Sequence, residues 1–344
     1  MGINVGGFEL GNVRLVTPVI LAPMSGVTDK PFRRLVNRLG AGLVVSEMIA
    51  SEASVREARQ AMRARKLQED YSDEGPMAVQ LAGCDPETMA EAARIQRDRG
   101  AAIVDINFGC PVKKIVTKYA GSALMREEAL AGRILERVAA AVHPLPVTLK
   151  MRLGWDRDSL NAPAFARMAQ NAGIRMITVH GRTRQQLYNG TADWAEVANT
   201  KQATDLPVIV NGDIDTAEDV RTALAVSGAD GVMIGRAACG APWRLSQVMQ
   251  LLQTGRMGAA PGLAGQRDIA LEHYDALLEY YGTHRGVRIA RKHMAWYASG
   301  LPGAAAFKRA VMSAEQPEDA TRLIRQLYAD AQDAGHLSQR SQAA

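Results

Sequence analysis

Cysteine is scarce in this sequence, with three residues in 344: Cys84, Cys110 and Cys239. They lie far apart, form no Cys-x-x-Cys pair and show no metal-ligand spacing. We therefore expect no disulfide and no metal site, and a compartment that keeps thiols reduced.

Long apolar runs are missing as well. No stretch approaches the ~18 consecutive apolar residues of a membrane-spanning helix. The N-terminal segment MGINVGGFELGNV has no basic region followed by an apolar one, so we expect no secretory signal. Together these absences predict a cytoplasmic protein without a membrane partner, and we expect it to act as a monomer.

The chain does have a modest excess of positive charge. Its formal net charge is +5 at pH 7, which weakly favours an anionic partner. Hydrophobic residues make up 47% of the chain, an ordinary value that is enough for a sizeable core. The length fits one large domain, or a large domain with a small one.

Eight short strand-like runs recur along residues 18–236. Each is apolar until its last residues, as expected of parallel strands that are covered on both faces. Between them lie stretches of helical composition, for example 86–99, 127–142 and 217–227. Eight such units predict a closed (β/α)8 TIM barrel. The alternative is an open doubly wound sheet, but no Gly-x-Gly-x-x-Gly turn follows any strand here.

The barrel pattern has a short segment before it and a long one after it. Residues 3–17 alternate weakly between apolar and polar, which predicts a hairpin that plugs the bottom of the barrel. The Gly-, Ala- and Pro-rich stretch 255–265 is typical of a linker. We predict a catalytic barrel domain at 1–250, a small helical domain at 266–334 and a disordered tail at 335–344.

The C-terminal strand ends carry the functional groups in a barrel of this kind. In chain order the residues at these ends are Met24 with Ser25, Glu47, Gln80, Asn107 with Cys110, Lys150 with Arg152, His180 with Arg182, Asn211 with Asp213, and Gly235 with Arg236. A buried Lys or His is costly unless it is paired or contacts a ligand. Because Lys150 and His180 stand inside apolar strands, we predict that both contact a ligand.

Small residues follow the last two strands, at Asn211-Gly212-Asp213 and Gly235-Arg236. They let backbone N–H groups approach an anion, and the loops after strands seven and eight are the usual phosphate site of this fold. The sequence thus predicts a phosphorylated cofactor, although two ordinary glycine turns would look the same.

Residues 107–114 read Asn-Phe-Gly-Cys-Pro-Val-Lys-Lys, just past a strand end. Pro111 ends the strand and sets a turn, so the Cys110 thiol stands at the lip of the sheet beside the Asn107 amide. A thiol in that place can donate a proton, and Lys113 and Lys114 suit a polyanionic substrate. A buried structural cysteine in a turn is the alternative.

No acidic residue lies between Tyr280 and Ala314. Within this segment Arg288, Arg291 and Lys292 are spaced i, i+3, i+4 and therefore share one helical face. We predict that they contact the phosphates of a nucleic acid. A solvated basic face is the alternative.

Taken together, these motifs resemble the tRNA-dihydrouridine synthases, from about residue 8 to about residue 325 and in detail closest to the bacterial B-type branch. The segments that carry the resemblance are 22–33, 107–114, 121–124, 150–152, 180–184, 188–194, 211–213 and 235–236. The resemblance implies an enzyme that binds FMN and uses NADPH to reduce the C5–C6 bond of a uridine in the tRNA D-loop, with position 17 favoured.

The resemblance also implies a role for each residue. Pro23, Met24 and Ser25 would flank the flavin ring, Gln80 would hydrogen-bond its polar edge, and Lys150 would contact its N1/O2 side with His180 nearby. The flavin phosphate would be received by Asn211, Gly212, Asp213, Gly235 and Arg236. Cys110 would be the proton donor and Asn107 would orient the uracil. Independently of the resemblance, we predict further substrate contacts from Lys113, Lys114, Arg152, Arg182, Arg288, Arg291 and Lys292.

Two other functions compete with this one. A flavin reductase of a free pyrimidine would share the barrel, but it would not need the basic segment 280–314 or Lys113 and Lys114. A non-catalytic RNA-binding protein would not need Lys150, His180 or a phosphate site.

Overall fold

The computed structural model describes residues 6–64, 71 and 74–342, and the chain forms two compact units. The first takes in the described residues up to Arg236 together with Leu245–Gly258. The second takes in Ala237–Arg244 and the described residues from Ala259 onward. The chain therefore passes from the first unit to the second, returns for one helix and passes over again.

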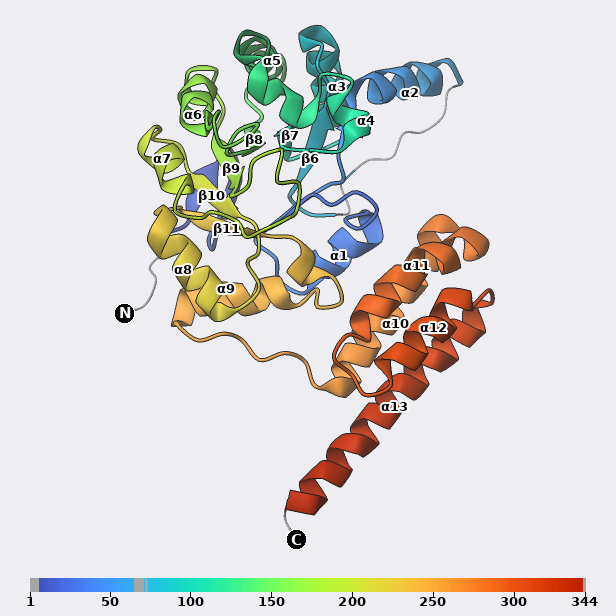
Figure 1. The fold of residues 1–344 in the computed structure, drawn as a ribbon. Coiled ribbons are helices and arrows are strands. Elements are labelled where there is room, and N and C mark those ends of the chain that lie inside the picture. The colour runs from blue at the N-terminus through green and yellow to red at the C-terminus, as the bar shows by residue number, and fades with distance from the viewer. Residues whose placement is uncertain (1–5, 65–70, 72–73, 343–344) are drawn as a thin grey trace. The chain divides into compact units, whose positions relative to one another are not determined.

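The first unit is a closed barrel of eight parallel strands (Figure 1). The strands are β3 (Val19–Leu21), β4 (Leu43–Val45), β6 (Met77–Ala82), β7 (Ile103–Phe108), β8 (Val147–Arg152), β9 (Met176–His180), β10 (Val208–Asn211) and β11 (Gly231–Ile234). Pairing of β11 with β3 closes the ring. A short strand, β5 (Ile49–Ala50), pairs with the far end of β6. The predicted (β/α)8 barrel is confirmed.

Helices cover the outside of the barrel (Figure 1). They are α1 (Lys30–Arg38), α2 (Ser51–Ala64), α3 (Pro86–Asp98), α4 (Lys113–Val116), α5 (Glu128–Val142), α6 (Ala162–Asn171), α7 (Val197–Gln202), α8 (Ala217–Ser227) and α9 (Arg244–Thr254), with 3₁₀ turns η1 (Gly121–Arg126) and η2 (Arg236–Ala238). Local sequence sets their starts. The Asp85 side chain caps α3, and Thr216 with Asp219 forms a capping box at α8.

An antiparallel hairpin of β1 (Phe8–Leu10) and β2 (Val13–Leu15) closes the N-terminal end of the barrel. Leu10 and Leu15 are buried against apolar side chains of the barrel strands, including Ile103 and Ile209. The predicted plug is therefore confirmed for the residues that the structure describes; residues 3–5 of the predicted segment lie outside them.

The side chains inside the barrel change from apolar to polar along its length. Above the apolar floor, Gln80 is the register partner of Asp105, and Asp105 that of Thr148. One layer closer to the C-terminal strand ends, Asn107 on β7 is the register partner of Lys150 on β8. The polar layers therefore lie toward the C-terminal strand ends, where the chemistry of this fold is found.

The second unit is a helical bundle. Its helices are α10 (Leu263–Tyr281), α11 (Thr283–Tyr297), α12 (Ala304–Ser313) and α13 (Pro317–Gln342). Helix α13 runs through residues 335–342 of the segment 335–344, for which the sequence predicted disorder; Leu, Gln and Arg in this stretch are good helix formers. No helix in the described part of the chain is long and apolar enough to cross a membrane.

Candidate functional site

The turn that carries Cys110 is held from three sides. Asn107 Oδ1 accepts hydrogen bonds from the backbone N–H groups of Gly109 at 3.0 Å and Cys110 at 2.8 Å. The Cys110 carbonyl accepts from Ser122, through N at 3.1 Å and Oγ at 2.9 Å. Arg152 Nε donates to the Gly109 carbonyl at 2.8 Å. The thiol therefore stands on a backbone that has little freedom to move.

The thiol itself is half-buried, and its protonation follows from that. Burial raises the pKa of Cys110, and the nearby Arg152 and Lys150 act in the opposite direction without reversing the effect. The group is thus a neutral thiol at physiological pH. A neutral thiol can give up a proton, whereas a thiolate would act as a nucleophile instead.

Lys150 projects from β8 into the polar layer of the barrel. Its Nζ donates to Asn211 Oδ1 at 3.0 Å, the one hydrogen bond that this ammonium makes with the described residues. An ammonium has three N–H donors, so two remain for a ligand. Burial, and then the charge of Arg152, lower the pKa of Lys150 to about 8. His180 is also half-buried, and burial followed by the surrounding cations lowers its pKa well below the usual value.

The end of β10 leads into a cluster of two arginines around one carboxylate. Asp213 pairs with Arg182, at 3.0 Å to Nη1 and 2.5 Å to Nη2, and with Arg236 Nη2 at 2.8 Å. Although burial acts to raise it, the Arg182 hydrogen bonds and the Ala192 N–H keep the pKa of Asp213 below its usual range. The Asp213 carboxylate repels a phosphate, so its contribution to an anion site is to hold the two guanidinium groups.

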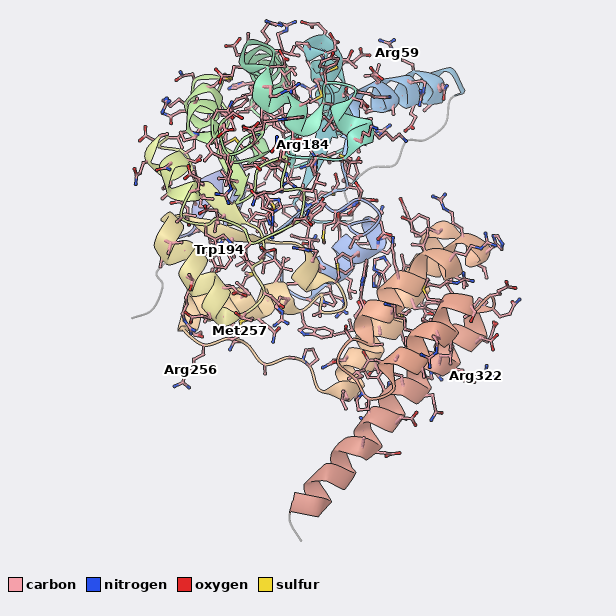
Figure 2. All side chains as sticks on the ribbon, viewed as in Figure 1. Arg59, Arg184, Trp194, Arg256, Met257 and Arg322 are labelled. Carbon is pink, nitrogen blue, oxygen red and sulfur yellow. The ribbon has the colours of Figure 1, made fainter. Side chains whose placement is uncertain are left out.

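Gly212 is required by its backbone and by its surroundings. Its φ is +115°, and an added Cβ would lie 2.8 Å from Ala192 Cβ and from His180 Cδ2. The Gly212 carbonyl accepts from Trp194 Nε1 at 2.8 Å. Trp194 is labelled among the side chains of the barrel unit in Figure 2. Gly235 differs, because its added Cβ would make only ordinary contacts of 3.6 Å with Ala22 and Met24.

Arg152 and Arg182 are both 1% exposed. Arg152 Nη1 donates to the Thr183 and Leu187 carbonyls at 2.8 Å each, besides the bond of Nε to Gly109. Their guanidinium groups therefore tie loops of the barrel mouth together. Lys113 and Lys114, by contrast, are exposed on α4.

Pro23, Met24 and Ser25 follow β3; the first two are half-buried and Ser25 is exposed. Met24 N donates to Thr28 Oγ1 at 2.9 Å, which closes the loop on itself. The Glu47 carboxylate, at the end of the neighbouring strand, accepts from the Gly26 N–H. This loop thus has a fixed backbone beside the polar layer.

Sequence reasoning missed Asp105 and Thr148. Thr148 Oγ1 donates to Asp105 Oδ1 at 2.6 Å, and both residues are buried. A signal existed in the run Ile103-Val-Asp-Ile-Asn-Phe. Asp105 and Asn107 are two residues apart, so their side chains share the inner face of the strand.

The basic residues of the second unit differ in their exposure and in their hydrogen bonds. Arg291 donates to the Ala314 carbonyl through Nη2 at 2.7 Å and Nε at 3.2 Å, so its guanidinium caps the end of α12. Lys292 is half-buried. Arg288, Lys308 and Arg309 are exposed.

The polar layer fits an anionic cofactor with a polar edge. Lys150, His180 and Arg236 lie close enough for the charges of Lys150 and Arg236 to lower the pKa of His180, and the Gln80 carboxamide lies in the layer below. The chemistry of this donor set matches a phosphate and the carbonyl and nitrogen edge of a flavin. Within the described ranges, no three His, Cys, Asp or Glu side chains gather as a metal site.

The sequence as a whole has known relatives. The family model described as "Dihydrouridine synthase (Dus)" matches residues 20–334. A protein of Rickettsia bellii named "Probable tRNA-dihydrouridine synthase" is 54% identical over 309 residues, covering 90% of this chain and 94% of its own length. "tRNA-dihydrouridine synthase B" of Xanthomonas campestris is 49% identical over 328 residues, covering 95% of this chain and 97% of its own.

Solved structures resemble the fold at much lower identity. A morphinone reductase variant in complex with tetrahydroNAD has a TM-score of 0.51 and 15% identity, covering 77% of this chain and 94% of its own. At that identity the likeness concerns the barrel alone.

Proposed function

The chain belongs to the dihydrouridine synthase family, and we propose that it reduces the C5–C6 double bond of a D-loop uridine in tRNA, with FMN as cofactor and NADPH as reductant. The observation that carries the proposal is the neutral thiol of Cys110, held in a fixed turn beside the layer of polar side chains in the barrel that contains Asn107 and Lys150. Because the motifs of the sequence resemble the bacterial B-type branch, we propose position 17 as the uridine that is reduced. We further propose a monomer that acts in the cytoplasm.

The cofactor would be held by groups from several strand ends. Lys150 would place its two remaining N–H donors against the N1/O2 side of the ring, and His180 would lie close by as a neutral imidazole. Pro23, Met24 and Ser25 would flank the ring. When bound and reduced, the flavin would supply a hydride to C6 of the uracil.

The phosphate of the cofactor would lie at the ends of β10 and β11. Arg236 is exposed and kept in place by Asp213, so it can offer its remaining N–H donors to an anion. Backbone groups of Asn211, Gly212, Asp213 and Gly235 would line the same site. Gln80 would hydrogen-bond the polar edge of the ring from the layer below.

Proton delivery would fall to Cys110. Hydride addition at C6 leaves negative charge at C5 and O4 of the uracil, and a positioned acid that protonates C5 removes it. The Asn107 carboxamide would orient the uracil while its Oδ1 keeps the turn closed. A uridine in folded tRNA is stacked or paired, so it would have to leave the stack to reach this layer.

The RNA backbone would meet positive charge on both units. Lys113 and Lys114 are exposed on the loop that follows Cys110. We propose Arg288 and Lys292 as phosphate contacts on α11. Arg152, Arg182 and Arg291 would serve the same RNA indirectly, by holding the segments that carry the exposed cations.

A single experiment separates this function from its rivals. Purified protein should show a flavin absorbance spectrum, oxidise NADPH, and form dihydrouridine in unmodified tRNA transcripts but not reduce free uracil. Reduction of free uracil at a comparable rate would favour a free-pyrimidine reductase. Colourless protein that cannot be reconstituted with FMN yet binds tRNA would overturn the enzymatic proposal.

A further inference from the structure

Asp105 is a buried carboxylate that none of the roles above uses. It lies on β7 one layer below Asn107 and is 3% exposed. Its Oδ2 accepts from Gln80 Nε2 at 2.7 Å, and its Oδ1 accepts from Thr148 Oγ1 at 2.6 Å. Both oxygens are therefore satisfied within the same layer of the barrel.

The hydrogen bonds continue from Asp105 to the Cys110 turn. Gln80 Oε1 accepts from Asn107 Nδ2 at 2.7 Å. Asn107 Oδ1 in turn accepts from the N–H groups of Gly109 and Cys110. One unbroken line of hydrogen bonds thus runs from the buried Asp105 carboxylate through Gln80 and Asn107 to the backbone that holds the Cys110 thiol.

The orientation of the Gln80 carboxamide within this line of hydrogen bonds depends on the Asp105 carboxylate. A carboxamide has a donor end and an acceptor end of nearly the same shape, so its neighbours decide which way it faces. Asp105 Oδ2 only accepts, so the amino group of Gln80 must face it. If Gln80 were reversed, its carbonyl would oppose the carboxylate and its amino group would oppose that of Asn107. Two repulsive contacts would then replace two hydrogen bonds.

We propose that Asp105 is a positioning residue: it holds the Gln80 carboxamide with its carbonyl toward Asn107 Nδ2 and so steadies Asn107, whose Oδ1 holds the backbone under Cys110. A protonated Asp105 gives Gln80 the same orientation when its proton lies on Oδ1, because Oδ1 then donates to the Thr148 hydroxyl and Oδ2 still accepts from Gln80. The catalytic consequence rests on the proposed function, whereas the orientation is a property of the chain alone.

The test is amide hydrogen exchange at Gly109 and Cys110, resolved by residue in the purified full-length chain. Asp105→Ala should raise exchange at these two amides about tenfold, the effect of losing roughly one well-made hydrogen bond. Thr148→Val is the matched control, since it removes the other bond to Asp105 and leaves the line intact. It should change exchange by less than about twofold.

Asp105→Asn serves as the conservative rescue. Its Oδ1 can accept from Gln80 Nε2 while its Nδ2 donates to the Thr148 hydroxyl, so exchange should stay within about twofold of the unaltered chain. Unchanged exchange in Asp105→Ala, or equal exchange in the Asn and Ala variants, overturns the positioning role. If Asp105→Ala does not fold, Gln80→Met breaks the line at its middle and must give the same increase.

This readout needs neither flavin nor tRNA. A negative exchange result therefore overturns the role of Asp105 and leaves the proposed function standing. In the enzyme with flavin bound, Asp105→Ala should slow reoxidation of the flavin by tRNA more than reduction of the flavin by NADPH. The reason is that the line of hydrogen bonds ends at Asn107 and Cys110, the residues proposed to act on the uracil.

Discussion

Lys150 Nζ donates to Asn211 Oδ1 at 3.0 Å, although the two residues lie on β8 and β10 with β9 between them. The bond therefore crosses the inside of the barrel instead of following the sheet. Asn211 Nδ2 donates to the Met233 carbonyl at 2.8 Å, which sets the end of the amide that faces the ammonium. Lys150 is thus positioned before any ligand arrives.

Replacing Lys150 tests the cofactor site. Lys150→Met should weaken FMN binding by about 10- to 100-fold, because a hydrogen bond from a charged group is lost. Flavin content after purification and fluorescence titration of the apoprotein measure this. Lys201→Met is the control: it removes a lysine that pairs with Asp230 at 2.7 Å, and it should leave the titration unchanged. Equal affinity in Lys150→Met and the unaltered chain would place the flavin elsewhere.

The pKa of Lys150 predicts how cofactor affinity varies with pH. Burial holds that pKa at about 8, so the ammonium loses its proton as the pH rises through this value. FMN affinity should therefore fall between about pH 7 and pH 9, and binding near pH 8 should take up protons. Titrations in buffers of different ionisation enthalpy detect the uptake. In Lys150→Met this pH dependence should vanish; its persistence would assign the ionisation to another group.

Cys110 should be needed for one of the two half-reactions only. Cys110→Ala should keep its flavin and its reduction by NADPH, while dihydrouridine formation falls by at least about 100-fold, as for the loss of a general acid. Rapid-mixing absorbance follows both steps. Cys84→Ala, a change at another half-buried cysteine, should affect neither. If tRNA reoxidises the Cys110→Ala flavin at the normal rate with dihydrouridine formed, the acid is another group.

The basic residues of the helical unit should differ in what they do. Replacing Arg288 and Lys292 together by Ala should weaken tRNA binding and flatten its salt dependence by up to about two units of log K per log salt, one per lost contact. Flavin content should not change. Filter binding across salt concentrations measures the slope. An unchanged slope would show that these cations face only solvent.

Arg291→Ala provides the contrast for that experiment. The Arg291 guanidinium is bonded to the Ala314 carbonyl, so its loss should lower the free energy of unfolding by about 1 kcal/mol. A denaturant titration measures this. The salt slope should change little.

The barrel was predictable because its signals are local. Short apolar runs identified all eight strands, and the caps that Asp85 and Thr216 provide for α3 and α8 are likewise set by nearby residues. The stretches expected at 86–99, 127–142 and 217–227 are helices α3, α5 and α8 within one residue. Each of these elements is encoded by residues that are neighbours in the chain.

Other features depend on residues that are far apart in the sequence. The sequence shows Arg291 on the same helical face as Arg288, but not that the Ala314 carbonyl needs a donor. Asp105 likewise gains its role from Gln80, 25 positions earlier. Such contacts exist only after the strands and helices pack, so spacing along the chain cannot reveal them.

The hairpin β1–β2 gives the barrel a closed floor and one open mouth. A reactant that reaches Lys150 inside the barrel must enter and leave through that mouth. In the proposed reaction nicotinamide and uracil would both have to reach the flavin through this single passage. They would therefore take turns: oxidised nicotinamide leaves before the uridine arrives. That order is the ping-pong kinetic scheme, in which the flavin alone carries the electrons from one visit to the next.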